Sequence, residues 1–280
     1  MDNKEKKELQ LLANDMRKDV VNEVYSAQSG HPGGSLSICD TLAYLYSKVI
    51  KIDPKNPKWE DRDRFVLSKG HTCPALYAAL AEMGYFPKEE LLGFRKYGRM
   101  LQGHPDMKGI PGVDMSSGSL GQGISAAVGM ALAAKLAGKD YRVYTVLGDG
   151  EIEEGQVWEA AMCAHHNNLS NLTAIVDNNG LQIDGNIEDV AGPYPIPEKF
   201  EAFGWKVILA DAHDFDSLEA AFNEALAEKE KPTVIIQKSV KGKGVSFMEN
   251  SAGWHGKAPN EEQYNTAMAD LEAVRKGLEA

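Results

Sequence analysis

One stretch, from Tyr141 to Gly185, constrains the fold of this chain more than any other. Its apolar run at 143–147 predicts a strand, and the Gly-Asp-Gly that follows predicts a turn. The segment from about Glu154 to Asn168 predicts a helix, and the run at 172–176 predicts a second strand. A strand, a helix and another strand in this order are typical of a parallel sheet.

The same order returns further along the chain. Trp205–Ala210 reads as a strand, Phe215–Glu228 as a helix and Thr233–Gln237 as the last strand. Phe65–Leu67 is a further short, buried strand. We therefore predict an α/β fold, a doubly wound and mostly parallel sheet flanked by helices, built as a single domain over 1–280.

Polar residues follow two strands of this predicted sheet. Asp149 follows the first strand of the opening stretch, and Asn179 follows the second. Ligands of parallel sheets collect beyond the carboxyl ends of the strands, so both side chains should lie on the ligand side. Their oxygens suit a hard cation such as Mg²⁺, and Gly150 leaves room for a phosphate to approach the backbone. The stretch predicts a site for a diphosphate with its metal.

Composition narrows the class of protein. The 280 residues are 43% hydrophobic, which is enough for a core, and the net charge of -11 disfavours nucleic acid and anionic membranes as partners. The three cysteines are scattered without a CxxC, so a reduced cytoplasm fits better than a disulfide framework. No apolar run approaches the roughly 20 residues of a membrane span, and the charged N-terminus does not read as a signal peptide.

Three of the seven histidines, His31, His71 and His104, lie in Gly-His turns. Loops after or between regular elements carry chemistry in many proteins, and the repetition weakens a chance explanation. A zinc site is a rival interpretation, but the chain has no HxxxH and no Cys/His pair with ligand spacing. A fourth histidine, His255, follows the last strand in the sequence WHG.

The other predicted elements surround these turns. Helices are expected at 4–28, at 87–97, at 123–137 behind a glycine-rich loop, and at 261–280. Ser35 or Ser37 should cap a helix that runs through Ile50. The proline-rich segment 192–200 reads as a surface loop, and Lys241 and Lys243 read as solvated side chains. The glycine-rich loop lacks the full GxGxxG of a dinucleotide site and follows no clear strand.

Collected in order, six motifs resemble those of transketolase. They are SGHPG, SKGHTCPAL, GHPD, GSLGQGISAAVGMA, GDG with NN, and WHGKAP, and they cover about Ser29 to Pro259. The resemblance implies the diphosphate-binding (PP-type) domain of the thiamin diphosphate fold. It also implies thiamin diphosphate with Mg²⁺ as cofactors, with Ca²⁺ or Mn²⁺ able to substitute.

The resemblance assigns roles to individual residues. It implies that the metal is bound by Asp149, Asn179 and the carbonyl of Leu181. It implies that thiamin diphosphate contacts His71, Gly118, Ser119, Leu120, Gly150, Asn179 and His255. It further implies that His31, His104 and His255 face the sugar, with His31 and His255 assisting proton transfers at the donor hydroxyl.

Two departures from the family pattern stand out. Ser119 replaces the proline that commonly precedes GQG by two positions, a small change in a backbone contact. Transketolases are also usually far longer, and the second half carries the pyrimidine-binding domain, with the glutamate that activates the cofactor ring. We therefore expect an N-terminal subunit of a split transketolase. Its partner would be a separate C-terminal subunit, in a heterotetramer of two copies of each chain.

The assembled enzyme would be a cytoplasmic transferase of the pentose phosphate pathway. It would move a two-carbon ketol unit from a ketose phosphate to an aldose phosphate. Two alternatives stay open: a 1-deoxyxylulose-5-phosphate synthase-like thiamin enzyme, and a non-catalytic scaffold that retains the fold. For Glu154, a solvated helix-start carboxylate and a residue near a subunit interface are equally good interpretations.

Overall fold

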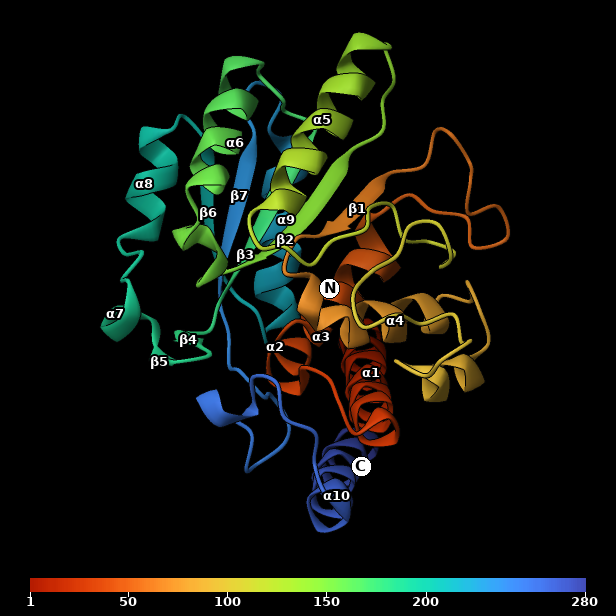
Figure 1. Ribbon diagram of the computed structural model, residues 1–280. Coiled ribbons are helices and arrows are strands. Elements are labelled where there is room, and N and C mark those ends of the chain that lie inside the picture. Colours follow the sequence, from red (N-terminus) through yellow and green to blue (C-terminus); the bar gives the residue numbers. More distant parts are fainter.

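The computed structural model describes residues 1–280 and is built on one five-stranded sheet (Figure 1). All neighbours in the sheet run parallel, in the order β1-β2-β3-β7-β6. The strands are β1 (Arg64–Leu67), β2 (Val143–Gly148), β3 (Leu172–Asn178), β6 (Lys206–Asp211) and β7 (Thr233–Lys238). A small antiparallel pair, β4 (Leu181–Gln182) and β5 (Gly185–Asn186), follows β3. The predicted parallel α/β sheet is confirmed.

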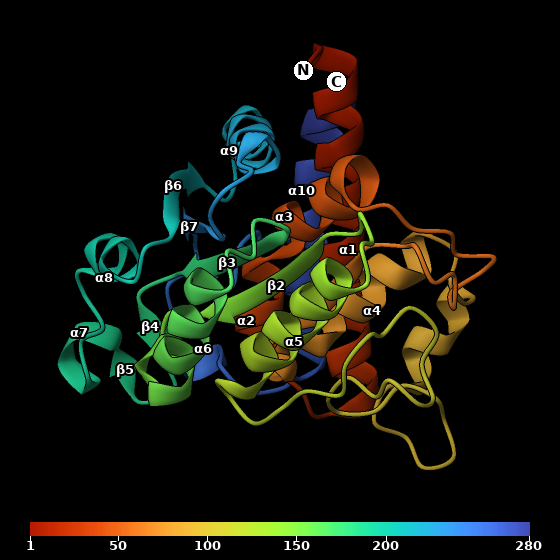
Figure 2. The same cartoon turned by 90° about the horizontal axis from the view of Figure 1, so that it is seen from above.

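Helices cover both faces of this sheet, as Figure 2 shows from above. On one face, α5 (Gln122–Leu136), α6 (Gly155–His166) and α8 (Ile196–Ala202) bury their apolar side chains against alternate residues of the strands. The other alternate residues face a larger cluster with α1 (Asn3–Ala27), α3 (Cys39–Tyr44), α4 (Cys73–Glu82) and α9 (Phe215–Ala227). Side chains alternate between the faces of a strand, so strands apolar throughout require cover on both sides.

The remaining helices pack mainly on other helices and loops and not on the five-stranded sheet. They are α2 (Pro32–Ser37), α7 (Ile187–Val190) and α10 (Glu261–Glu279), with a π-helical turn at Leu45–Val49 and 3₁₀ turns at Gly70–Thr72, Lys88–Gly93, Glu151–Glu153 and Ala252–Trp254. The α10 helix lies along α1, and Asn260 and Gln263 close a capping box at its start. No helix combines the length and the apolarity that a membrane span requires.

Three local predictions were wrong. The helix after the first His turn begins at Pro32, not at a serine cap, because Ser35 Oγ donates to the His31 carbonyl and Ser37 Oγ to Asp177. The helix expected at 87–97 is only a 3₁₀ turn over Lys88–Gly93. The segment 192–200 is not all loop: α8 begins within it and buries Ile196 and Phe200 under the sheet.

Candidate active site

A cavity of about 240 Å³ lies at the carboxyl edge of the sheet, where β1, β2, β3 and β7 end side by side. Many of the residues singled out from the sequence line it. They are His71, Leu120, Asp149, Gly150, Asn179, Leu181 and His255. Parallel strands bring their carboxyl ends to one edge, so residues that follow four different strands share one cavity, together with Leu120 of the glycine-rich loop.

Asp149 is a buried acidic group of the cavity wall, with 2% of its surface exposed. Its carboxylate accepts the backbone N–H of Gly150 at 2.9 Å and that of Gly180 at 2.6 Å, and it has no ion-pair partner. Burial, reinforced by the neighbouring Asp177, raises the pKa of Asp149 to about 6. A buried carboxylate without a cation costs free energy, and a metal ion here would remove that cost.

Asn179 and Leu181 present further oxygens to the same cavity. The Asn179 amide nitrogen donates to Asp177 at 3.1 Å, which orients its carbonyl oxygen; that oxygen accepts the Leu181 N–H at 3.1 Å. The chain has no group of three or more His, Cys, Asp or Glu side chains placed to hold a metal. One carboxylate, one amide oxygen and one backbone carbonyl form a set of hard oxygen donors, which fits Mg²⁺ completed by phosphate and water.

Lys69 and Asp177 form a buried ion pair beneath the cavity. Lys69 is 2% exposed and Asp177 1%, and the ammonium also donates to the Gly34 carbonyl at 3.1 Å. Burial acts to raise the pKa of Asp177, but the Lys69 charge and the hydroxyls of Ser37 and Ser239 hold it below its ordinary value. The pair ties the ends of β1 and β3 to α2.

Glu151, another residue of the cavity wall, connects three segments around the cavity. Its carboxylate accepts hydrogen bonds from the Ser68 hydroxyl, the Gly121 N–H at 2.9 Å and the Gly148 N–H at 3.0 Å. The side chain is 2% exposed, and burial raises its pKa. Glu151 therefore holds the glycine-rich loop against the ends of β1 and β2, and nothing in its sequence context predicted this role.

The four site histidines form one cluster, although they are distant in the sequence; His71 and His255 line the cavity, whereas His31 and His104 do not. The ring centroids of His31 lie 5.2 Å from His71, 5.6 Å from His255 and 6.4 Å from His104, and His71 stacks on His255 at 5.0 Å. The Nδ1 atom of His31 is buried without a hydrogen-bond partner. The cluster is thus a set of close, partly unsatisfied imidazoles beside the cavity.

These imidazoles are held neutral. Burial is the largest cause in each case; it lowers the pKa of His31 to about 4, with help from Arg95, and that of His255 to about 3, with help from Lys241. The pKa of His71 lies well below its ordinary value, and that of His104 is also lowered. All four imidazoles are thus in the neutral form, which is the form that can accept a proton, while the low pKa of His31 and of His255 weakens each of these two as a base.

The glycine-rich loop closes the cavity through Leu120, which is 37% exposed. Gly118 and Ser119 precede Leu120 and do not line the cavity themselves. Gly118 has φ +154°, and a Cβ there would lie 3.0 Å from His104, so glycine lets the loop approach this histidine. Glu154 is exposed at the start of α6, as a solvated carboxylate would be.

The prediction of a solvated Lys241 was wrong. Lys241 is 2% exposed and donates to the Leu181 carbonyl at 3.2 Å and to His255 Nδ1 at 3.1 Å. Burial, followed by the charge of Lys69, lowers the pKa of Lys241 to about 8. Its ammonium gives the cavity a positive charge opposite Asp149, which suits a diphosphate bound with its metal.

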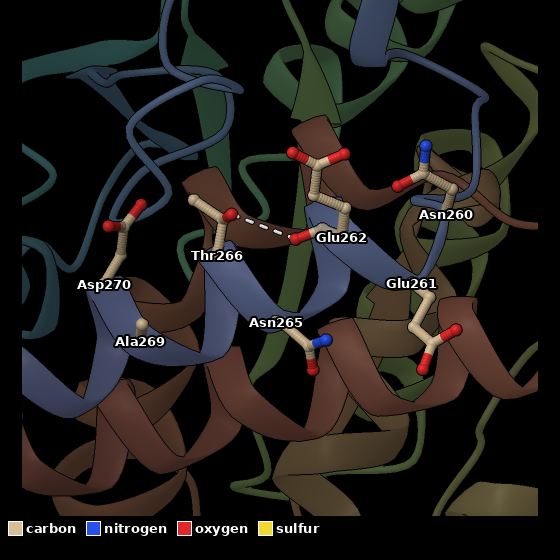
Figure 3. Close-up of a pocket in the computed structure, with 7 residues that line it drawn as sticks. All are labelled: Asn260, Glu261, Glu262, Asn265, Thr266, Ala269 and Asp270. Carbon is tan, nitrogen blue, oxygen red and sulfur yellow. Dashed lines mark hydrogen bonds between the residues drawn. The ribbon is translucent and has the colours of Figure 1, made fainter.

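A second hollow, of about 820 Å³, lies on the outer side of α10 (Figure 3). It is wide and shallow, and Glu262, Thr266 and Asp270 point to the same side of the helix. It has no basic side chain among its lining residues, which are Asn260, Glu261, Glu262, Asn265, Thr266, Ala269 and Asp270. Three carboxylates would repel an anionic cofactor, so this hollow does not compete with the sheet-edge cavity.

Known proteins resemble the whole of this chain. The family described as "Transketolase, thiamine diphosphate binding domain" matches residues 8–272. The chain is 48% identical over 265 residues to the 6-deoxy-6-sulfo-D-fructose transketolase subunit SqwG of Clostridium sp. (strain MSTE9), covering 95% of this chain and 96% of that protein. It is 40% identical over 271 residues to an apulose-4-phosphate transketolase subunit of Phocaeicola vulgatus, covering 97% and 96%.

A solved structure agrees with the fold. The transketolase of Campylobacter jejuni superposes with a TM-score of 0.89 at 33% identity, covering 96% of this chain but 45% of the longer one. The chain therefore spans about half of that transketolase and nearly all of the two subunits above. These likenesses favour transketolase over a 1-deoxyxylulose-5-phosphate synthase-like enzyme and over a scaffold.

Proposed function

We propose that this chain, which belongs to the transketolase family as its N-terminal, thiamin diphosphate-binding domain, is one subunit of a transketolase assembled from two kinds of chain. The observation that carries the proposal is the sheet-edge cavity. It combines hard oxygen donors, a buried ammonium and the neutral imidazoles of His71 and His255. His31 packs against both of these rings, and His104 lies 6.4 Å from His31 between ring centroids. We take residues 1–280 as a single domain, because all helices of both faces pack on one sheet or on each other.

The metal end of the cofactor would lie against Asp149. The Asp149 carboxylate, the Asn179 amide oxygen and the Leu181 carbonyl would hold Mg²⁺, or Ca²⁺ or Mn²⁺ in its place. Asp149 supports this role as a buried carboxylate with no ion-pair partner. The Lys241 ammonium donates a hydrogen bond to the Leu181 carbonyl in this structure, and it would form an ion pair with the diphosphate.

The other contacts with the cofactor would come from residues around the cavity and from the glycine-rich loop. His71, Gly150 and His255 line the cavity beside the metal donors, and Leu120 closes it from the glycine-rich loop, with Gly118 and Ser119 shaping the approach. Thiamin diphosphate, when bound, supplies the carbanion-stabilising chemistry that ketol transfer requires. The chain's own task is to bind and orient it and to handle protons.

His31, His104 and His255 would handle those protons. Each has a lowered pKa and is therefore neutral, which is the form that would take a proton from a sugar hydroxyl and then return it. We assign His31 and His255 to the donor hydroxyl, since they lie 5.6 Å apart between ring centroids. The ring centroid of His104 lies 6.4 Å from that of His31, and His104 would contact the remainder of the sugar.

The rest of the active site would come from a C-terminal subunit with a pyrimidine-binding domain. Two relatives that match nearly the full length of this chain are named as transketolase subunits, which supports a partner chain. We propose a heterotetramer in which this chain also associates with a second copy of itself, with Glu154 near that interface. Its three unpaired cysteines fit the cytoplasm, where the pentose phosphate pathway would use the enzyme.

The test is a ketol-transfer assay with Mg²⁺ and thiamin diphosphate, first with this chain alone and then with its candidate C-terminal subunit. Xylulose 5-phosphate and ribose 5-phosphate are the first donor and acceptor. The relatives' names add 6-deoxy-6-sulfo-D-fructose and apulose 4-phosphate as further sugars. Activity in the mixture only would support the proposal, and Asp149→Ala should abolish it. Activity of the chain alone would contradict the shared site, and no activity with any of these sugars would favour a scaffold.

A further inference from the structure

Arg95 stands out in a loop to which neither the motifs nor the cavity assign a role. Its backbone has φ +56°, the left-handed region that a residue other than glycine, asparagine or aspartate rarely adopts. Its N–H donates to the Leu101 carbonyl at 2.9 Å, so the chain folds back on itself between Gly93 and Gly103. Strained backbone of this kind persists only where surrounding contacts enforce it, and it often marks a functional position.

The Arg95 guanidinium joins the two loops that carry His31 and His104. One terminal nitrogen donates to the Ser29 hydroxyl at 2.8 Å, and the other to the Gly103 carbonyl at 3.2 Å. Ser29 is two residues before His31, and Gly103 immediately precedes His104. A planar guanidinium with donors in a fixed fork is well suited to hold two acceptors in one relative position.

The fit around this guanidinium is close. A Cβ at Gly103 would lie 2.9 Å from the Arg95 Nε, so glycine is needed for the loop to pass this close. The Nε atom is buried and has no hydrogen-bond partner of its own. The Lys96 ammonium donates to Ser26 at 2.8 Å, which ties the same loop to the end of α1. The position of Arg95 is therefore fixed from several sides.

The charge of Arg95 also reaches the histidines. After burial, it is the largest cause that lowers the pKa of His31 and of His104. The other charged or titratable groups facing His31 are His104 and Lys241, with the rings of His71 and His255 packed against it. A positive charge beside an imidazole disfavours its protonated form.

We propose that Arg95 is a positioning residue of the active site, whose guanidinium clamps the loops of His31 and His104 together. The inference rests on the proposed function, because it assumes that these histidines act on the sugar. It predicts that the length and the forked donors of the arginine are needed to place the two loops, whereas a lysine at this position would keep only the positive charge beside the imidazoles.

The test compares Arg95→Met and Arg95→Lys with a matched control, Arg99→Met, in the same loop. Arg99 is exposed and its only ion pair, with Glu90, spans 3.2 Å. In the assembled enzyme, Arg95→Met should lower kcat on the order of 100-fold, since small misplacements of catalytic groups cost that much. It should also move the acid limb of the kcat/KM profile to higher pH. Arg95→Lys should lose kcat but keep the acid limb, and Arg99→Met should change neither.

A second readout needs neither partner nor sugar. NMR titration of the ring signals of His31 and His104, in the chain alone, should give higher pKa values in Arg95→Met than in the wild type, with little change in Arg95→Lys. Thermal unfolding of each variant shows that the chain is folded. Unchanged titrations, or a wild-type kcat in Arg95→Met, would overturn the proposal. If the wild-type mixture is inactive but the histidines of the chain alone titrate as expected, the proposed function is refuted, and the contact of Arg95 with the two histidine loops remains supported.

Discussion

Glu23 provides the sharpest test of the energetics of this fold. It lies in α1 with none of its surface exposed, and neither carboxylate oxygen has a hydrogen-bond partner. Burial, reinforced by the nearby Asp19, raises its pKa well above the ordinary value of 4.5. We predict that Glu23→Met and Glu23→Gln both stabilise the chain at neutral pH.

The magnitude follows from proton linkage. The native state holds the Glu23 proton at pH values where the unfolded chain has released it, so this residue makes stability fall as the pH rises. The fall begins near the unfolded pKa and ends at the raised folded pKa, with a slope of about 1.4 kcal/mol per pH unit. Glu23→Met also removes an unsatisfied buried polar group, which adds roughly 1–3 kcal/mol at every pH.

The assay is urea unfolding of the chain, followed by circular dichroism at several pH values from about 5 to 8. Other groups titrate in the same range, so the measured quantity is the difference in unfolding free energy between variant and wild type. For both variants that difference should grow with pH, by up to about 1.4 kcal/mol per pH unit, until the pH reaches the raised pKa of Glu23 in the folded chain. Glu8→Met, at an exposed position of the same helix, serves as the control and should show no such growth. A difference that stays flat with pH would refute the reasoning.

Three further predictions concern the site. Lys69→Met should destabilise the chain by about 3–5 kcal/mol, because it leaves Asp177 buried without a cation. In the same urea assay, adding Asp177→Asn to Lys69→Met should recover part of this loss, and additive effects of the two substitutions would contradict the pairing. His213 accepts the Val240 N–H at 2.9 Å, and its other ring nitrogen is hydrogen-bonded to Asp40, so it holds the chain next to Lys241 in place. His213→Leu removes both hydrogen bonds and should raise the KM for thiamin diphosphate about tenfold in the assembled enzyme. His213→Gln keeps an acceptor and a donor and should bring the KM back close to the wild-type value, and an equal KM in the two variants would count against this role. Asp149→Asn should weaken Mg²⁺ binding, measured by calorimetry with the assembled enzyme and cofactor, by at least about tenfold, and an unchanged affinity would rule out Asp149 as a ligand.

The sequence predicted much of the fold because its patterns are local. Strands apolar throughout, separated by amphipathic helices, require a parallel sheet with cover on both faces, and β1, β2, β3, β6 and β7 begin and end within a residue or two of their predicted bounds. The wrong predictions also have local causes. The 3₁₀ turn stops at Gly93 and Arg95 leaves the helical region with φ +56°, so no helix covers 87–97; Pro32 opens α2 where a serine cap was expected.

The candidate site was predicted in part. Asp149, Asn179 and His71 follow predicted strands, so a parallel sheet alone brings them to one edge. Lys241 also follows a strand, but a lysine in a glycine-rich, polar stretch gave no signal of burial. Its environment depends on the Leu181 carbonyl and His255, which other segments deliver.

The sequence by itself determined the order of strands and helices along the chain and the turns that carry the histidines, because hydrophobic periodicity and turn-forming residues act between near neighbours in the sequence. The tertiary structure decided which polar groups are paired. Lys69 meets Asp177 across 108 positions, Glu151 meets Ser68 across 83, and Arg95 meets Ser29 across 66. The charge state and placement of these side chains depend on burial and on partners in space, and neither is encoded in the residues next to them.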